Sequence, residues 1–172
     1  MPEIDHAIAS PEVITLEAVS IDHPDAVLLM HQLNQRLERL SGDSGASRFD
    51  AASMPAGRSV FLVARGRDGA LLGCGALRPL AQAGAAPVAE LKRMYARDGT
   101  RGVGRALLQA LEREARTLGY RAVWLETRRI NERALRFYRR HGYSDIPNYG
   151  AYADRRDAVC LGKTLNPEPS WN

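Results

Sequence analysis

Few cysteines and histidines, and no long apolar segment, limit what this 172-residue chain can be. Its two cysteines, Cys74 and Cys160, are too few for a disulfide framework, so we expect both to be small buried residues. None of the four histidines stands at metal-ligand spacing with another histidine or a cysteine, so we predict no metal site. No apolar run approaches the roughly 20 residues of a membrane span, and the N-terminal "MPEIDHAIAS" lacks the features of a signal peptide. These absences favour a cytoplasmic protein that needs neither membrane nor metal.

The composition is that of a folded protein, with 45% apolar and 26% charged residues. No repeat or shift in composition divides the chain, so we expect one domain over 1–172, with its core at about 12–165 and a tail at 166–172. The net charge of +4 comes mostly from arginine. Such an excess suits a ligand with several phosphates as well as nucleic acid.

The hydrophobic pattern predicts a mixed sheet with helices on its faces. Apolar residues at steps of three and four indicate helices over 22–42, 103–118 and 131–142, with a short helix near 47–53. Strands are expected over 12–20, 58–66, 71–80, 88–96, 120–128 and 158–165, with a further short strand after residue 142.

Local signals add detail to these elements. Asp22 is the expected N-cap of the first helix, Pro24 suits its first turn, and Gly42 ends it. In the strand 71–80, Gly73 and Gly75 are expected to mark a β-bulge. The buried face of the first helix is predicted to comprise Val27, Met30, Leu33, Leu37 and Leu40. The apolar stripe of the second long helix is predicted to comprise Val103, Leu107, Leu111, Ala115 and Leu118.

The segment "RMYARDGTRGVGRALL" (93–108) joins a strand to a helix through glycines, an arrangement that often holds a phosphate. A Walker loop would need Lys and Ser or Thr directly after its second glycine. Gly99 and Gly104 have the right separation, but Arg105 and Ala106 follow. This nucleotide-binding motif is therefore excluded.

The dinucleotide fingerprint is excluded as well, because counting from Gly102 its third glycine position is Leu107, which is too large for close helix–strand packing. What remains is Gly102-x-Gly104 at the start of a helix, flanked by Arg101 and Arg105. Such a turn can direct N–H groups at a pyrophosphate. It can equally be a tight strand–helix turn that only requires glycine.

Two motifs together are more specific than this turn alone. The run 99–104 and the helix after it resemble the signature [QR]-x-x-G-x-[GA] of the GNAT superfamily of acyl-CoA N-acyltransferases. The segment 131–143 is similar to the second motif of that family, N-x-x-A-x-x-x-Y-x-x-x-G-F. "ELKRMYA", "LET" and "YGAYA" further resemble one bacterial branch, and the resemblance extends over 13–165. Two positions depart from it: Gly99 replaces the usual Gln or Arg, and "LETR" replaces "LETG".

The resemblance implies an α+β fold with a mixed, mostly antiparallel sheet, and acetyl-CoA bound where the strands 90–96 and 120–128 diverge. The pantetheine arm would pair with backbone groups of Met94, Tyr95 and Ala96. The pyrophosphate would be held by the N–H groups of Arg101, Gly102, Val103, Gly104 and Arg105. Asn131 would contact the pantetheine, orient the next helix, or simply cap it.

Direct acyl transfer to an amine needs a neutral amine, a polarised thioester and a protonated leaving thiolate. The resemblance places Tyr138 as the acid for the thiolate, although the residue also reads as a core aromatic. An amide N–H at Met94 or Tyr95 would polarise the carbonyl.

Glu90 lies at a position where the family often has a glutamate, and it is the first candidate for the base. Strand alternation places Glu90, Lys92 and Met94 on one face. Alternatively, Glu90 is a solvated charge or an ion pair with Lys92 or Arg93. Glu126, at the end of the next strand, is the rival carboxylate on the acceptor side.

The acceptor is expected to be an amine of a small molecule or peptide, bound near Tyr149, Tyr152 and Arg155, where arginine would favour an acidic acceptor. The competing hypothesis is a non-catalytic acyl-CoA-binding or nucleic-acid-associated module that uses arginines of 128–140. Glu132 interrupts this run and stacking aromatics are absent, so we expect no nucleic-acid partner. Homodimers are common in the family, but no residue here demonstrates one.

Overall fold

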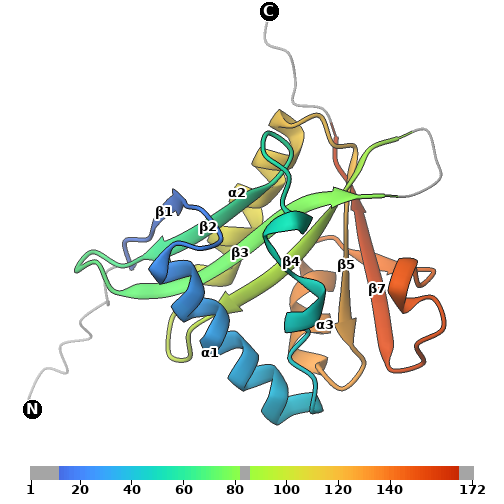
Figure 1. Cartoon of the computed structure of the whole chain (residues 1–172), viewed down its shortest axis with the longest axis horizontal. Coiled ribbons are helices and arrows are strands. Elements are labelled where there is room, and N and C mark those ends of the chain that lie inside the picture. The colour runs from blue at the N-terminus through green and yellow to red at the C-terminus, as the bar shows by residue number, and fades with distance from the viewer. Residues whose placement is uncertain (1–11, 82–85, 167–172) are drawn as a thin grey trace, which may run out of the picture.

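The computed structural model of the chain describes residues 12–81 and 86–166 (Figure 1). Of the predicted tail 166–172, only Asn166 lies within the described residues. The loop predicted before the strand 88–96 also lies partly outside them. The elements predicted within the described ranges are present, with bounds that differ by a few residues.

Seven strands of the described residues form one sheet in the order β1-β2-β3-β4-β5-β7-β6. Their bounds are β1 Thr15–Ala18, β2 Val60–Arg65, β3 Leu71–Leu80, β4 Val88–Ala96, β5 Ala122–Arg128, β6 Ser144–Ile146 and β7 Ala158–Thr164. Every neighbouring pair is antiparallel except β4 and β5, which are parallel. The expected mixed, mostly antiparallel sheet is confirmed.

Helices cover both faces of this sheet. The α-helices are α1 Pro24–Ser41, α2 Val103–Thr117 and α3 Glu132–Arg140, and the short 3-10 helices are η1 Ala46–Arg48, η2 Ala51–Ser53 and η3 Gly150–Tyr152. Figure 1 shows α1 in front of the sheet and α2 behind it. The predicted helix 47–53 is thus two separate 3-10 turns.

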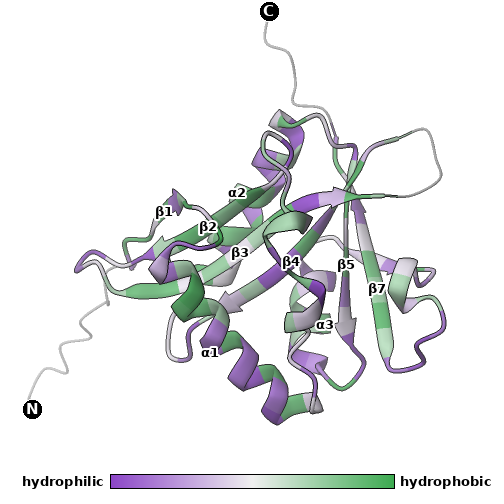
Figure 2. Ribbon diagram, viewed as in Figure 1, coloured by the Kyte–Doolittle hydropathy of each residue, from purple (hydrophilic) through white to green (hydrophobic). Residues whose placement is uncertain are grey.

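The hydrophobic core is divided between the two faces. On the α2 and α3 face, four residues of the predicted stripe are buried: Val103, Leu107, Leu111 and Ala115. On the α1 face, Leu29 and Leu33 pack with Phe61 and Cys74. Figure 2 shows the matching hydrophobic stretches on β2, β3 and β7. The sheet is therefore held between two apolar layers, which fixes its central strands.

The N-cap of α1 is His23, not the predicted Asp22. The His23 Nδ1 accepts a hydrogen bond from the Asp25 N–H at 3.1 Å, whereas the Asp22 carboxylate accepts one from the Ser20 hydroxyl. Pro24 begins the helix as expected. The prediction was wrong by one residue because both Asp and His offer a short acceptor just before Pro24.

The buried face of α1 also differs from the prediction. Val27 and Leu40 are 51% and 37% exposed, while Ala26, Leu29 and Leu33 are buried. Residues 26–30 read "AVLLM", all apolar, so several helical faces satisfy the same steps of three and four. Periodicity could not choose between them.

β4 carries a bulge opposite the glycine-containing part of β3. The pairing passes from Cys74 opposite Tyr95 to Ala76 opposite Lys92, so β4 has one extra residue there. Within it, Arg93 has φ 56°, which is unusual for a residue other than glycine. The predicted bulge is confirmed, and its extra residue lies on β4.

The bulge changes which side chains of β4 share a face. Glu90 and Lys92 contact Tyr149 and Tyr152, whereas Met94 packs in the α2 cluster on the other side. A Cβ on Gly75 would lie 2.5 Å from the Met94 sulfur, so glycine permits this close packing. The prediction that Met94 shares a face with Glu90 was wrong, because strand alternation ends at a bulge.

β4 and β5 separate after a short parallel ladder. Their pairing covers only Val88–Glu90 with Ala122–Trp124, although β4 continues to Ala96 and β5 to Arg128. No strand of the described residues occupies the opening between the two strands beyond that point. The sheet therefore has a gap in its centre, open toward the carboxyl ends of β4 and β5.

Both cysteines are buried and unpaired, as predicted. Burial raises the pKa of the Cys74 thiol to about 12, so this group remains protonated at neutral pH. Within 12–81 and 86–166, none of the helices combines the length and apolar character that crossing a membrane requires. The same residues contain no grouping of three or more metal-ligating side chains.

Candidate active site

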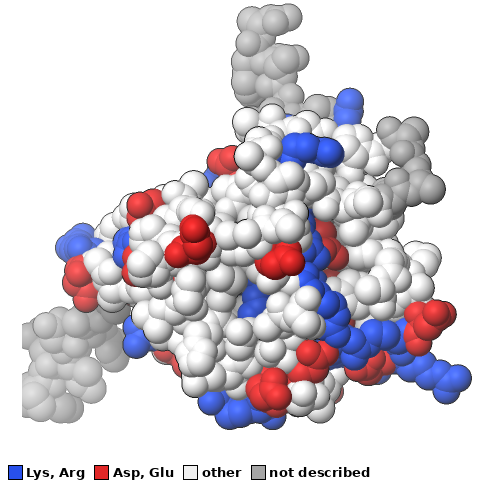
Figure 3. Space-filling view, in the orientation of Figure 1, with Lys and Arg blue, Asp and Glu red and all other residues white. Residues whose placement is uncertain are grey.

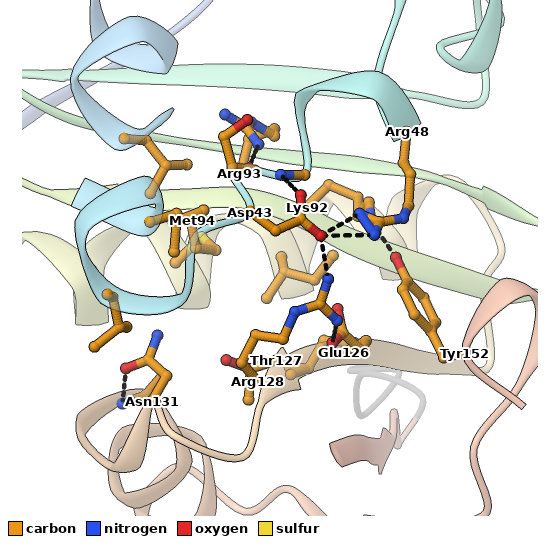
Figure 4. A pocket seen from close by; sticks show the side chains of 18 of the residues that line it. Asp43, Arg48, Lys92, Arg93, Met94, Glu126, Thr127, Arg128, Asn131 and Tyr152 are labelled. Carbon is orange, nitrogen blue, oxygen red and sulfur yellow. Dashed lines mark hydrogen bonds and ion pairs between the residues drawn. The ribbon is translucent and has the colours of Figure 1, made fainter. Parts of the chain in front are cut away.

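A cavity of about 140 Å³ lies where β4 and β5 separate (Figure 4). Its walls come from α1 and the segment 43–48 after it, from β4 and β5, and from α3 and η3. Five of the predicted site residues line it, namely Met94, Glu126, Asn131, Tyr138 and Tyr152. Lys92 lines it as well. Segments far apart in the chain thus meet at the gap in the sheet.

One wall of the gap is backbone. The Arg97 N–H donates to the Leu72 carbonyl at 2.8 Å, toward β3. Because successive backbone groups alternate in direction along a strand, the N–H and C=O of Ala96 face away from β3, into the gap. The Ala96 carbonyl accepts a hydrogen bond from Arg36 of α1 at 3.1 Å. The end of β4 thus offers a strand edge that β5 does not cover.

The glycine turn continues directly from this edge. The Thr100 N–H donates to the Arg97 carbonyl at 3.2 Å, and Gly99 in this reverse turn has φ 80°. Few residues other than glycine adopt that conformation. Gly99, which departs from the family pattern, is therefore required by the backbone of this turn.

The N-terminus of α2 is open. Gly102, with φ 74°, occupies the N-cap position without a side-chain hydrogen bond. No hydrogen bond within the described chain uses the N–H groups of 101–105. A Cβ on Gly104 would lie 3.4 Å from Phe137 of α3, an ordinary van der Waals contact, so the packing of the two helices does not itself require glycine here. Free N–H groups at the positive end of a helix form an anion-binding site.

Two residues of the second motif connect α3 to the cavity. The Asn131 side chain accepts from the Ala134 N–H at 3.2 Å, so it caps α3. Tyr138 is 7% exposed, and no hydrogen bond joins its hydroxyl to the described residues. Burial raises the pKa of Tyr138, so its hydroxyl holds a proton at neutral pH.

Glu90 is engaged in a buried network. Its carboxylate is 2.7 Å from Arg78 of β3 and accepts from the Tyr149 hydroxyl at 2.8 Å. One interpretation of Glu90 was an ion pair with Lys92 or Arg93. The structure has an ion pair, but the partner of Glu90 is Arg78. Both carboxylate oxygens have partners, and Glu90 does not line the cavity.

Glu126 is the carboxylate at the end of β5 that lines the cavity. Burial raises its pKa, although the Arg128 guanidinium at 2.7 Å opposes this shift. A carboxylate with a raised pKa is a stronger base at neutral pH than an ordinary glutamate. Glu126, unlike Glu90, lines the cavity, so it is the carboxylate placed to take a proton there.

Asp43 joins three arginines across the mouth of the cavity. Its carboxylate contacts Arg48 at 2.9 Å, Arg128 at 2.6 Å and Arg155 at 3.8 Å. Its pKa is lowered, first by the Gly45 N–H and then by the Arg128 and Arg48 guanidinium groups, so it stays ionised. Figure 3 shows basic and acidic side chains gathered together to the right of α1. Asp43 and Arg48 were missed because the polar connection that carries them contains no motif.

The remaining predicted residues lie on the same side. Tyr152 is buried and accepts a hydrogen bond from Lys92 at 2.6 Å. Tyr149 contacts Tyr152 edge to face, and Arg155 pairs with Asp157 at 3.0 Å. The structure therefore brings the predicted acceptor loop to the cavity, with Tyr152 in its lining and Tyr149 and Arg155 next to it.

The fold and motifs agree with three comparisons. The sequence model described as the Acetyltransferase (GNAT) family matches residues 28–143. The chain is 35% identical over 147 residues to an IAA acetyltransferase of Azospirillum brasilense, covering 82% of this chain and 92% of that protein. It is 26% identical to a Klebsiella pneumoniae structure described as an acyl-CoA N-acyltransferase, with a TM-score of 0.75 over 90% of this chain and 99% of the other. A Thermoplasma acidophilum PaiA N-acetyltransferase in complex with coenzyme A shares the fold at 18% identity and TM-score 0.64, covering 88% of this chain and 99% of that one.

Proposed function

The chain belongs to the GNAT acetyltransferase family, and from that premise we propose that it transfers the acetyl group of acetyl-CoA directly to an amine. The observation that carries this proposal is the pair of open backbone segments, the edge of β4 that β5 leaves uncovered and the N-terminus of α2. It leads into a cavity that contains a buried tyrosine and a carboxylate.

The backbone fits the two polar parts of the coenzyme. The uncovered edge of Met94–Ala96 suits the amides of a pantetheine arm, which would add to β4 like a further strand. The N–H groups of 101–105 suit a pyrophosphate, and Arg101 and Arg105, both exposed, add positive charge. Asn131 would then act chiefly as the cap that orients α3.

The proposed chemistry uses two side chains. Glu126 removes a proton from the acceptor ammonium, and the neutral amine attacks the thioester carbonyl. The N–H of Met94 stabilises the developing oxyanion. The Tyr95 N–H is not proposed for this role, because strand alternation directs it toward β3, where Tyr95 pairs with Cys74. As the amide bond forms and the C–S bond breaks, the Tyr138 hydroxyl donates its proton to the leaving sulfur. The nitrogen then loses its second proton, which returns to the Tyr138 phenolate through solvent, and Glu126 releases its own proton to bulk water before the next turnover. Glu90 holds Arg78 and Tyr149 behind the acceptor site.

The test combines binding with turnover. Saturating acetyl-CoA should stabilise the fold by about 3 kcal/mol at a hundredfold excess over its dissociation constant, measured by thermal unfolding. Release of free CoA should appear with members of a panel of primary amines. An unchanged melting temperature in millimolar acetyl-CoA would refute the proposal.

Tyr138→Phe should lower turnover by about 100-fold, while acetyl-CoA still raises the melting temperature. The hydroxyl has no partner in the described chain, so its removal should not disturb the fold. Tyr120→Phe, a buried tyrosine variant outside the cavity, is the control and should keep wild-type turnover. Undiminished turnover of Tyr138→Phe would remove this residue as the acid.

A further inference from the structure

The chain contains two lysines, Lys92 and Lys163, and their surroundings differ. Lys163 contacts both carboxylate oxygens of Glu112 at 3.0 Å and donates to the His141 carbonyl at 3.0 Å. The side chain of Lys92 makes a single hydrogen bond within the described chain, at 2.6 Å to the neutral Tyr152 hydroxyl. Lys163 is thus neutralised inside the protein, whereas Lys92 has no carboxylate within ion-pair distance there.

The carboxylates around Lys92 are already paired with arginines. Glu90 is held by Arg78, Glu126 by Arg128, and Asp43 by Arg48 and Arg128. Counting these groups, three carboxylates face three arginines, and the Lys92 ammonium is an additional charge. Arg93 also lines the cavity without a carboxylate partner among the described residues, but its guanidinium donates to the Ser44 and Met30 carbonyls and to the Asn34 side chain. The cavity therefore carries an excess of positive charge, of which Lys92 is the part with free donors.

This ammonium is available to a ligand. An ammonium has three N–H donors, of which Tyr152 takes one. Lys92 lines the cavity together with Glu126, and Figure 4 shows the Lys92 nitrogen beside Tyr152 and Arg48. Burial lowers the pKa of Lys92, which indicates that the charged form lacks full compensation. A ligand anion that bound here would supply it.

We propose that the acceptor is an amine that also carries a carboxylate, as in an amino acid, with the carboxylate on the Lys92 ammonium and the amine facing Glu126. The inference rests on the proposed acetyl transfer and adds the substrate class. A cation and a carboxylate on the wall of one small cavity complement the two charges of such a zwitterion. A simple amine without a carboxylate would leave the Lys92 charge without a counterion.

The experiment compares amino acids with their α-carboxamides, which keep the shape and the amine but lose the negative charge. The wild-type kcat/KM should be at least tenfold higher for the acids, as expected for a hydrogen-bonded charge pair. Lys92→Met should reduce this ratio to about one by raising KM for the acids, with little change for the amides. Lys92→Arg should retain a preference for the acids, and Arg136→Met, which removes an exposed charge elsewhere, should behave as wild type.

Several results would overturn the inference. These are equal kcat/KM for acids and amides, equal losses for both in Lys92→Met, or turnover of no carboxylated amine in the panel. Intact-mass detection of acetylated Lys92 after incubation with acetyl-CoA alone would also overturn it, because the amine would then be a nucleophile. Thermal stabilisation by acetyl-CoA distinguishes failure of the substrate class from failure of the proposed acetyl transfer. If acetyl-CoA still stabilises the protein, only the substrate class is wrong. If it does not, the proposed acetyl transfer is wrong as well.

Discussion

The two halves of the central gap are built in different ways. The coenzyme half, comprising the end of β4, the turn 97–102 and the first turn of α2, presents consecutive backbone groups. The acceptor half, comprising Asp43, Arg48, Lys92, Glu126, Arg128 and Tyr152, presents charged or polar side chains from four separate segments. In the proposed function, backbone groups bind a feature that every acyl-CoA shares, whereas the side chains of the acceptor half can be exchanged without altering the fold. The difference suggests that coenzyme binding and acceptor choice can be changed independently.

The largest effect is expected from the acceptor half. Glu126→Gln keeps the size of the side chain but removes the base, so kcat/KM should fall by about 10² to 10⁴. Acetyl-CoA affinity, measured by calorimetric titration, should stay within about twofold. Glu132→Gln on the exposed face of α3 is the control. A combined loss of turnover and coenzyme affinity would contradict the independence of the two halves.

A substitution in the coenzyme half is expected to weaken the binding of acetyl-CoA. Gly102→Ala places a Cβ at φ 74°, which costs about 1–2 kcal/mol and shifts the N–H groups after it. We expect about tenfold weaker acetyl-CoA binding. Gly119→Ala at the end of α2 is a matched control, because its φ of 87° imposes similar strain away from the gap. Equal losses of coenzyme affinity in both variants would show that general destabilisation is the cause.

A smaller effect is expected at the mouth of the cavity. Asp43→Asn removes the charge that Arg48 and Arg128 share, so both guanidinium groups should be less well positioned. The KM for the acceptor should rise several-fold in steady-state kinetics, while that for acetyl-CoA stays constant. Asp145→Asn, in an exposed pair with Arg139, is the control. A rise confined to the KM for acetyl-CoA would contradict the independence of the two halves.

The pH dependence should show the smallest change. Because burial raises the pKa of Glu126, the acid limb of kcat/KM should lie above 4.5, the ordinary glutamate value. Activity is then lost as the pH falls through the raised pKa and the base becomes protonated. Arg128→Gln removes the opposing positive charge, so this limb should move to higher pH. A limb that moves to lower pH in this variant would exclude Glu126 as the titrating group.

The local structure of the proposed coenzyme half could be predicted from the sequence because its residues are consecutive. Gly102, Gly104 and the helix after them form a local pattern with a local physical reason, and the Asn131 cap was recognised for the same reason. The acceptor half depends on contacts such as Asp43 with Arg128, which are 85 residues apart. The bulge at Arg93 places Met94 on the α2 face of the sheet, which strand alternation alone cannot predict. Pairing of Glu90 with Arg78 likewise depends on the register between β3 and β4.

The most direct test of the account is a crystal structure of the protein with coenzyme A. The pyrophosphate should accept hydrogen bonds from the N–H groups of 101–105, and the pantetheine arm should run along Met94–Ala96. Its sulfur should lie within hydrogen-bonding reach of the Tyr138 hydroxyl, on the side of the cavity that leads to Glu126. Coenzyme bound outside the gap between β4 and β5, or with its sulfur directed away from Tyr138, would contradict the account.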